Sequence, residues 1–466
     1  MPRLTFLISF LCALFIISCK KDSFITSPDA KISFSADTIQ FDTVFAATAT
    51  ITQSFKILNL NGQKLTLSTI RLAGGQTSPF KININGASVT ESNNVVLAAN
   101  DSLYVFVTVY VDPSANNLPF VLQDSIEVDY NGNQSWVQLE AWGQNAHFLR
   151  NTEISKNTVW PNDLPYVILG GLLVDSATTL TIQPGCRIYF HANAPMLVNG
   201  TLQVLGEKYD STRVNFQSDR LDKPYSGFPG SWPGIVFQSS SVNNLLQYAN
   251  INNSYQALVV AEPSANNNPK LSLKECIINN AYSTGILGIH TSIYAENCLV
   301  SNCGNNIVLS NGGTYQFFQC TVVGYSNTYV IHADPVLTIA NYPLTEISSG
   351  TSNLVSQFSN CIFWGEGGDV DDEVQLGNQG DSLFSAKFAN CIWKSQNFPS
   401  QADTTQIFLN QDPDFQLIDN VKLSYDFRLN STSPAIDKGI NLGITLDLDG
   451  NPRPVNLPDL GAYEKQ

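Results

Sequence analysis

The sequence is poor in charged residues. Of 466 residues only 14% are Asp, Glu, Lys or Arg, and the 24 basic residues are outnumbered by 39 acidic ones. Nucleic-acid binding needs cations that neutralise phosphates, so an acidic chain without a stripe of Lys or Arg argues against a nucleic-acid partner. No long stretch has apolar residues at helical spacing, which favours a chain built almost entirely of strands. The length predicts two or three domains.

The N-terminus has the features of a secretory signal. Residues 1–18 hold a single Arg3, a short apolar run and a small residue before Cys19. Such a segment is too short to stay in the membrane as a spanning anchor. The four residues "IISC" that end at Cys19 resemble the lipobox of bacterial lipoproteins, which implies that Cys19 is acylated and becomes the first residue of the mature protein. An ordinary signal peptide with an unmodified cysteine is the alternative.

Residues 19–29 then form a lipidated tether. The Lys-Lys-Asp that follows Cys19 resembles the surface-export signal of Bacteroidota lipoproteins, although only one acid is present. A plain solvated tether is the alternative. The resemblance implies an outer-membrane lipoprotein with palmitate on Cys19, anchored through its lipid and exposed at the cell surface.

Residues 30–146 predict an immunoglobulin-like β-sandwich. Apolar residues occupy every second position in runs such as "SLYVFVTVYV", so one face of each strand would be buried and the other solvated. Asn-Gly at 61–62 and 131–132 predicts hairpin turns. About seven short strands suit such a sandwich. The segment also resembles the immunoglobulin-like modules that precede repeat domains in bacterial surface lipoproteins, which implies a spacer or docking role.

Residues 150–428 have a different spacing of apolar residues. Pairs of apolar residues recur from Leu172 and Val174 onward, with starting positions that advance by 8, 8, 8 and 6 residues, and turn formers such as Pro184-Gly185 lie between them. Three such short strands make one coil, and a coil of this size buries its apolar face only by stacking on its neighbours. The stretch 180–207 resembles the opening coils of bacterial parallel β-helix proteins. We therefore predict a right-handed parallel β-helix.

Five cysteines mark equivalent corners of successive coils. In the aligned motifs an apolar residue lies three before the cysteine, a polar residue directly before it and another apolar residue two after it. This pattern predicts a strand, a tight corner whose polar residue has left-handed backbone, and a new strand, with the thiol entering the core. The residues are Cys276, Cys298, Cys320, Cys361 and Cys391.

Three chemical roles remain open for these cysteines. Stacked coils place equivalent Cβ atoms about 4.8 Å apart, beyond the roughly 3.5–4.5 Å usual for a disulfide, so buried thiols acting as small apolar side chains are the prediction. One disulfide, or a metal site at the close pair Cys298 and Cys303, are the alternatives. The residue after four of the five cysteines is also apolar, as in Ile277 and Leu299, and this predicts that another element or a partner covers that outer face.

The β-helix prediction raises the question of catalysis. β-Helices often carry polysaccharide lyases and hydrolases, but a lyase acting on uronates needs Lys or Arg near a cleft, commonly with Ca²⁺. No Lys or Arg occurs between Lys274 and Lys387. Only the early coils could supply one, from Arg187, Arg213 or Arg220. A hydrolase needs two facing carboxylates, which the acids of these coils permit without demonstrating.

Two local features are candidate binding sites. The stretch "GEGGDVDDE" at 365–373 holds acids that could coordinate Ca²⁺, with a solvated loop as the alternative. These candidate ligands are Asp369, Asp371, Asp372 and Glu373. Trp232, in a loop rich in Pro and Gly, is a candidate for stacking on a sugar ring, with packing in the β-helix as the alternative.

The last 38 residues, 429–466, carry an ordered set of motifs. These are "SPAID" from Ser433, "DLDGNPR" from Asp447 and "DLGAYE" from Asp459. They resemble the closing signature of the choice-of-anchor β-helix surface proteins of bacteria, and the resemblance implies a segment that caps the last coil. We predict that Arg453 pairs with Asp437, Asp459 or Glu464 in a structural role.

Together these features predict an all-β lipoprotein of the bacterial outer membrane, in which an immunoglobulin-like domain precedes a capped parallel β-helix. The expected function is binding or scaffolding without catalysis. The expected partners are other outer-membrane proteins or a glycan, with no cofactor except Ca²⁺ at the acidic loop. A polysaccharide hydrolase or lyase is the alternative.

Overall fold

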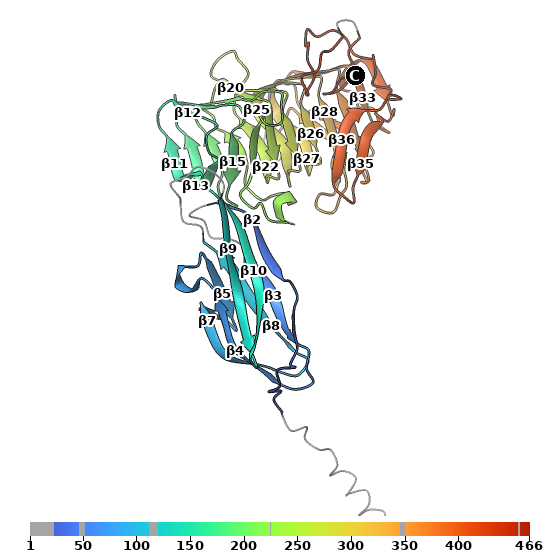
Figure 1. Cartoon of the computed structure of the whole chain (residues 1–466). Helices are drawn as coiled ribbons and strands as arrows, with labels where there is room; N and C mark the ends of the chain where they lie inside the picture. Colours follow the sequence, from blue (N-terminus) through green and yellow to red (C-terminus); the bar gives the residue numbers. More distant parts are fainter. Residues whose placement is uncertain (1–22, 46–51, 111–119, 224, 345–349, 455–456) are drawn as a thin grey trace, which may run out of the picture. The chain divides into compact units, whose positions relative to one another are not determined.

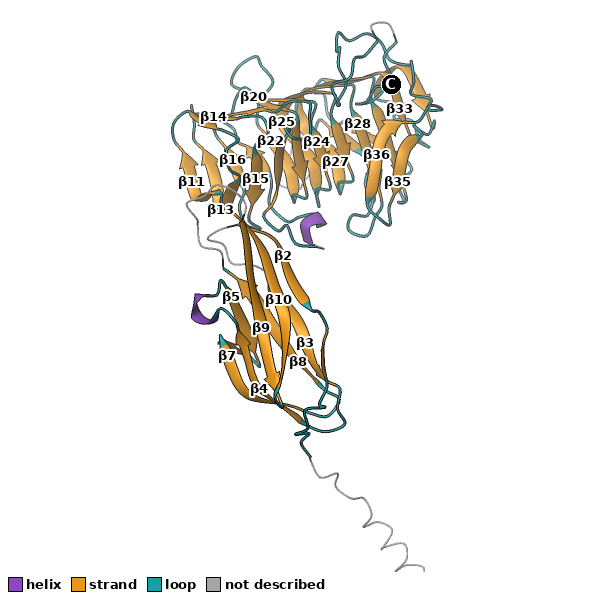
Figure 2. Ribbon diagram, in the orientation of Figure 1, coloured by secondary structure: helices purple, strands orange, loops and turns teal. Residues whose placement is uncertain are grey.

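The computed structural model describes residues 23–45, 52–110, 120–223, 225–344, 350–454 and 457–466. The chain divides into two compact units, residues 1–145 and 146–466. Strands dominate both units, and the described residues contain only two short 3₁₀ turns, η1 (Gly75–Thr77) and η2 (Tyr225–Gly227) (Figure 2). The predicted all-β class is confirmed.

Unit 1 is a β-sandwich of two five-stranded sheets. The first sheet has the order β1 (Ile32–Phe34), β3 (Gln53–Asn59), β8 (Ser102–Val109), β5 (Phe80–Ile84) and β6 (Ala87–Val89). The second has the order β2 (Thr38–Phe45), β10 (Asn133–Gln144), β9 (Phe120–Tyr130), β4 (Leu65–Leu72) and β7 (Glu91–Leu97). Neighbouring strands are antiparallel except β2 and β10, which are parallel. This arrangement is the predicted immunoglobulin-like sandwich.

One of the two predicted Asn-Gly hairpins of unit 1 is present. Asn131 and Gly132 both have positive φ, 44° and 81°, and join β9 to β10 in register. The prediction at 61–62 is wrong, because the flanking strands β3 and β4 belong to different sheets. The side chain of Asn59 donates instead to the carbonyl oxygens of Gln63 and Ala98 and shapes this connection.

Unit 2 is a parallel β-helix, as predicted (Figure 1). Each strand pairs in parallel with its equivalent in the next coil, so that Lys274 lies beside Glu296 and Glu296 beside Phe318. The coil strands in chain order are β11 (His147–Ile154), β12 (Thr158–Trp160), β13 (Tyr166–Val174), β14 (Thr179–Ile182), β15 (Arg187–Phe190), β16 (Met196–Val198), β17 (Thr201–Leu205), β18 (Val214–Ser218), β19 (Ile235–Phe237), β20 (Asn244–Gln247), β21 (Ala249–Asn252), β22 (Gln256–Ala261), β23 (Leu271–Lys274), β24 (Ile277–Asn279), β25 (Thr284–Glu296), β26 (Leu299–Ser301), β27 (Asn305–Phe318), β28 (Thr321–Tyr325), β29 (Leu337–Ala340), β30 (Leu354–Ser359), β31 (Ile362–Glu366), β32 (Val374–Gly377), β33 (Phe384–Trp393) and β34 (Ala402–Leu409).

Left-handed backbone turns the coils at the cysteine corners. The polar residue before each cysteine has φ between 48° and 56°, a conformation that Asn adopts more readily than most residues. These residues are Glu275, Asn297, Gln319, Asn360 and Asn390.

All five corner cysteines point into the core as free, buried thiols. Burial raises the pKa of Cys298 and Cys320 well above its usual value. The thiols donate to backbone carbonyls instead, as Cys298 does to Glu296 (Sγ to O, 3.2 Å). They act as small core side chains.

The terminal segment, defined here as residues 415–466, lies along the side of the β-helix. It begins with a hairpin of β35 (Phe415–Asp419) and β36 (Ser424–Leu429). Its backbone carbonyls accept bonds from corner side chains of separate coils: Asn297 donates to Leu446, Asn360 to Ile440 and Asn390 to Lys438. We expected residues 429–466 to cap the last coil and the β-helix to continue to residue 428. The hairpin at 415–429 is instead antiparallel, and the contacts of the segment place it across the corners of several coils.

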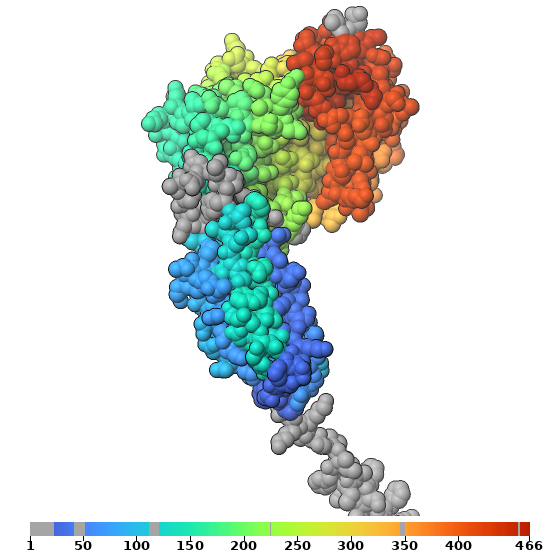
Figure 3. Space-filling model, in the orientation of Figure 1, coloured from blue at the N-terminus to red at the C-terminus, as the bar shows by residue number. Residues whose placement is uncertain are grey.

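The apolar residues that follow the corner cysteines are the reason for this placement. Leu299, Ile362 and Ile392 are buried in a second core beneath the terminal segment. The segment contributes apolar side chains to this core, among them Leu448 and Leu460, both fully buried. Burying a large apolar side chain contributes about 1.5–3 kcal/mol, so the outer face of these coils is more stable covered than exposed. In Figure 3 the red terminal residues form one continuous surface with the orange coils.

Candidate functional site

Cys19, the predicted site of lipidation, lies outside the described residues, which begin at Ser23. The lipid anchor therefore stays a prediction. In the part of the chain that the structure describes, none of the helical turns has the length and apolar character of a membrane span.

Trp232 is not an exposed sugar contact. Its side chain is 0% exposed, its ring stacks on Phe190 with centroids 4.3 Å apart, and its Nε1 donates to the carbonyl of Asn252 at 2.9 Å. The prediction was wrong because Trp232 pairs with Ser254 as part of the coil ladder, which turns the ring into the core.

The acidic loop does not gather its carboxylates. The four acids expected to hold Ca²⁺ are Asp369, Asp371, Asp372 and Glu373. Asp369 is exposed, whereas Glu373 is fully buried and lies 2.9 Å from Nε2 of His332. Asp372 accepts from the hydroxyl of Ser395 at 2.6 Å and from the two backbone N–H groups that follow. Among the described residues, no three His, Cys, Asp or Glu side chains form a group that could hold a metal ion.

The buried pair His332 and Glu373 lies against glycines of two stacked strands. A Cβ on Gly365 would lie 2.2 Å from His332 Nε2, and one on Gly324 would lie 2.5 Å from His332 Nδ1. The carboxylate of Glu373 also accepts from the backbone N–H of Val336 at 3.3 Å. His332 and Glu373 lie in two connections between coil strands. Their side chains pack these connections against the strands beneath and are buried from solvent.

The terminal signature forms a buried polar network. Arg453 Nη1 contacts Glu464 at 2.9 Å, so Glu464 is the partner among the three predicted acids. Asp459 accepts from the backbone N–H of Asp437 at 2.8 Å. Burial raises the pKa of Glu464 to about 7, and it also raises the pKa of Asp459. The network also joins the terminal segment to the β-helix, because Arg453 donates to Asn297 at a corner of a coil.

The early arginines are engaged elsewhere. Arg213 is buried and donates to the carbonyls of Glu275 and Leu448, while Arg220 pairs with Asp222 at 2.8 Å. Neither of them, nor Arg187, lines the polar hollow on the side of the β-helix.

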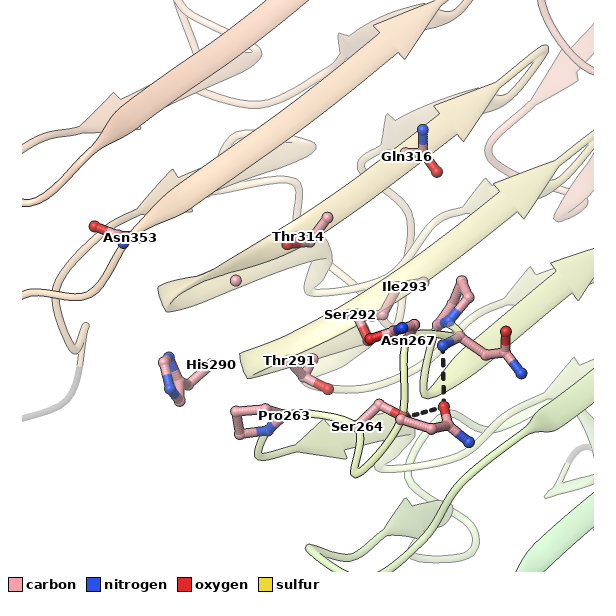
Figure 4. Close-up of a pocket in the computed structure, with 14 residues that line it drawn as sticks. Pro263, Ser264, Asn267, His290, Thr291, Ser292, Ile293, Thr314, Gln316 and Asn353 are labelled. Atoms are coloured by element: carbon pink, nitrogen blue, oxygen red, sulfur yellow. Dashed lines mark hydrogen bonds between the residues drawn. The ribbon is translucent and has the colours of Figure 1, made fainter.

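A polar hollow lies on the side of the β-helix between β25, β27 and the connection from β22 to β23 (Figure 4). Its volume is about 440 Å³. Asn, Ser and Thr predominate among its lining residues, and none is Asp, Glu, Lys or Arg. The lining residues are Pro263, Ser264, Asn266, Asn267, Asn268, Pro269, His290, Thr291, Ser292, Ile293, Gly313, Thr314, Gln316 and Asn353.

The floor of the hollow comes from outward positions of adjacent strands. Ser292 of β25 pairs with Thr314 of β27, and Gln316 follows two residues later on the same face. The strands turn at His290 and Asn311, which have φ of 48° and 61°. Nδ1 of His290 lies 3.0 Å from the carbonyl oxygen of Asn311, which only accepts, so Nδ1 donates this hydrogen bond.

Several polar groups of the hollow have no hydrogen-bond partner among the described residues. These groups are the side chains of Asn267, Thr314 and Gln316. The buried hydroxyl of Thr291 likewise has no partner in the described part of the chain. Amides and hydroxyls both donate and accept, so this surface can exchange hydrogen bonds with the hydroxyls of a ligand.

A buried lysine holds the wall of the hollow. Lys270 is 0% exposed, and its Nζ donates to the carbonyls of Gln238, Ser239 and Ala261 at 3.2, 2.9 and 2.7 Å. Burial lowers the pKa of Lys270, and the negative charge of Glu262 opposes this effect. The wall of the hollow is the connection at residues 263–269. The three bonds of Lys270 attach the start of β23, directly after the wall, to the coil that precedes the wall.

The sequence contains a feature that could have predicted this wall. Residues 263–269 read "PSANNNP", an insertion between strand motifs with two prolines and three successive asparagines. Asn266 accepts from the hydroxyl of Ser264 and donates to Asn243, so the wall is ordered by a bond within it and by a bond to a residue outside it. The outward positions of β25 and β27 gave no comparable signal, because they are ordinary solvent-facing residues.

Comparison with known proteins identifies no family. No protein-family model matches the sequence, and no curated protein matches it. Pectate lyase Pel9A is a structural neighbour with 11% identity and a TM-score of 0.34, covering 70% of this chain and 88% of that one.

Two further solved structures share only short stretches. A family 123 glycoside hydrolase from Clostridium perfringens has 9% identity and a TM-score of 0.19, and covers 28% of this chain. The VesB protease of Vibrio cholerae has 17% identity and a TM-score of 0.18, and covers 24% of this chain. The chain spans about a third, 31%, of the length of each of these two. Similarities of this size identify neither a family nor an activity.

Proposed function

We propose that the protein is a non-catalytic binding protein of the cell envelope whose β-helix binds a neutral glycan in the polar hollow. The observation that carries the proposal is the chemistry of the lining, where amides and hydroxyls face a space of about 440 Å³ and no side chain is Asp, Glu, Lys or Arg. Neutral sugars present many hydroxyls and no charge, so such a surface can satisfy them without burying an unpaired ion.

The same lining disfavours a reaction in the hollow. Hydrolysis of a glycosidic bond commonly uses two carboxyl groups, and elimination from a uronate uses a base beside a cation. His290 is the one titratable side chain of the lining, and its Nδ1 proton is committed to Asn311. Glu296, further along β25, is paired with Lys274 at 2.7 Å. These groups do not form an acid and base on either side of a bound sugar.

No protein partner is proposed for the apolar stripe of the coils. The apolar residues after the corner cysteines were the one sequence feature that favoured such a partner. The protein's own terminal segment buries them. An intramolecular cover accounts for this stripe, so the stripe no longer supports docking of a second protein.

The cellular location of the protein is part of the proposal as well. The signal at residues 1–18 and the "IISC" motif support lipidation at Cys19 and anchoring to the outer membrane at the cell surface. The variant Cys19→Ala should lose labelling with radioactive palmitate and leave the membrane fraction. Protease treatment of intact cells tests the surface orientation. A Cys19→Ala protein that still incorporates palmitate would contradict the anchor.

The binding proposal is tested with a panel of neutral polysaccharides, scored for binding by calorimetry and for cleavage by reducing-end release. The variants Thr314→Ala and Gln316→Ala should weaken binding to the neutral glycan that the wild-type protein selects. Gln357→Ala is the matched control, because Gln357 pairs with Gln316 in the next coil, is exposed and does not line the hollow. Cleavage of any polysaccharide in the panel would contradict the proposal and favour the enzyme alternative. Equal affinities of the wild-type protein and all variants would show that the glycan does not bind in the hollow.

A further inference from the structure

A second hollow lies on unit 1, on the outward face of the sheet β1-β3-β8-β5-β6. Its volume is about 400 Å³. Phe106 and Thr108 of β8 line it together with Lys81 and Asn83 of β5. Side chains alternate between the two faces of a strand, and the neighbours Val105 and Val107 are fully buried in the sandwich. The residues of the hollow therefore face away from the core.

Two aromatic rings form a flat apolar surface beside this hollow. Tyr104 and Phe106 lie two residues apart on β8, and their ring centroids are 5.9 Å apart with an angle of 15° between the planes. The two side chains are 47% and 42% exposed. A pyranose ring has an apolar C–H face and a rim of hydroxyls, so it fits a flat aromatic surface bordered by Asn83 and Thr108.

The same face is positive in an otherwise acidic chain. Lys56 Nζ lies 4.8 Å from the centroid of the Tyr104 ring, and Lys81 lines the hollow. Neither lysine forms an ion pair with a described residue. The five strands of this sheet contain no Asp or Glu, although the chain as a whole has 39 acids against 24 basic residues. Charge complementarity therefore selects an anionic ligand.

We infer that this face of unit 1 is a second binding site and that its ligand is a glycan carrying carboxylates. A sugar ring rests on Tyr104 and Phe106, and its carboxylate points toward Lys81 in the hollow. The inference is independent of the uncharged hollow in unit 2, which lacks both lysine and exposed aromatic rings.

The test uses the purified full-length protein and oligosaccharides of polygalacturonate, alginate and hyaluronate, with carboxyl-reduced polygalacturonate of equal length as the neutral counterpart. Binding is measured by calorimetry at low and moderate salt. At least one acidic oligosaccharide should bind, more weakly as salt rises. Phe106→Ala and Lys81→Gln should each raise Kd by roughly fivefold or more, since a ring or a charge-assisted bond is lost.

Trp136→Ala is the matched control, because Trp136 is 42% exposed on the other sheet of the same unit. It should bind like the wild-type protein. Absence of binding to all three acidic oligosaccharides would overturn the inference, as would unchanged Kd values for Phe106→Ala and Lys81→Gln. Equal binding of poly-glutamate, with the same dependence on both residues, would assign the face to an acidic protein instead. Thr314→Ala in unit 2 should leave binding of the acidic oligosaccharide unchanged, so the two proposed binding sites are tested independently of each other.

Discussion

Arg453 in the terminal segment donates from Nη2 to Oδ1 of Asn297, a corner residue 156 positions earlier in the chain, at 3.1 Å. The same guanidinium contacts Glu464 and donates to the carbonyl of Gly461. One fully buried cation therefore fixes the terminal segment internally and attaches it to a coil.

Arg453→Met should destabilise unit 2 by about 3–5 kcal/mol, because the carboxylate of Glu464 stays buried without its cation. Chemical denaturation measures the free energy of unfolding. Lys422→Ala is the control: its surface pair with Asp419 is 3.7 Å long and 81% exposed at the lysine, so its loss should change stability little. Equal stability of Arg453→Met and the wild-type protein would show that the network does not hold the segment.

The stability of unit 2 should fall as pH rises from about 5 to about 8. Burial is the main cause that raises the pKa of Glu275 from 4.5 to about 7. In this window the folded protein binds a proton that the unfolded chain has released, so the free energy of unfolding decreases with pH. Glu275→Gln should reduce this dependence without abolishing it, since Glu464 also has a raised pKa. A pH profile of the variant identical to that of the wild-type protein would contradict the expectation.

Gly365→Ala should destabilise the protein by about 1–3 kcal/mol, because the new methyl group overlaps the buried side chains of His332 and Glu373. Thermal unfolding of the variant measures the effect. Gly227→Ala is the matched control, since a Cβ there meets no atom within 4 Å. An unchanged unfolding temperature for Gly365→Ala would mean that the buried pair can leave its position at little cost.

Lys270→Met should loosen the wall of the polar hollow. Three backbone carbonyls lose their donor, which costs about 1–3 kcal/mol when such groups stay buried. Hydrogen exchange of residues 262–269 should speed up in the variant, and affinity for the neutral glycan should fall with it. The exposed Lys223 provides the control variant Lys223→Met. Unaltered exchange in Lys270→Met would show that the wall is held by its own asparagines alone.

The corner cysteines should be inert toward a thiol reagent such as DTNB in the folded protein. They are buried, and the pKa values of Cys276, Cys298, Cys320 and Cys361 are raised well above the ordinary value. Denaturation should release them to full reaction, which serves as the positive control. Rapid labelling of native protein would contradict the buried ladder.

The repeat pattern made the coils predictable because stacking forces one side-chain alternation on every coil. The motif around Cys298 predicted a corner, an inward thiol and left-handed backbone at Asn297, and all three are present. Trp232 was misjudged because Pro and Gly beside it suggested a loop, whereas the alternation of the coil decides where a side chain points.

The binding surfaces were not predictable in the same way. The polar hollow joins Asn267 from an insertion to Thr314 from a strand 47 positions later, and no local pattern relates them. The apolar stripe was noticed but its cover was not identified, because the burial of Leu299 and Leu460 in one core depends on how the chain returns along the β-helix. Sequence periodicity predicts the repeated strands and corners, whereas these sites depend on residues that are not part of the repeat.

The placement of the terminal segment has a consequence for how the β-helix unfolds. Arg213 donates to the carbonyl of Leu448, and Thr321 accepts from the backbone N–H of Ala462, so the terminal segment adds bonds to separate coils. In a solenoid each repeat normally contacts only its neighbours. Here one segment runs across several coils, so the coils that it spans should unfold together rather than one at a time.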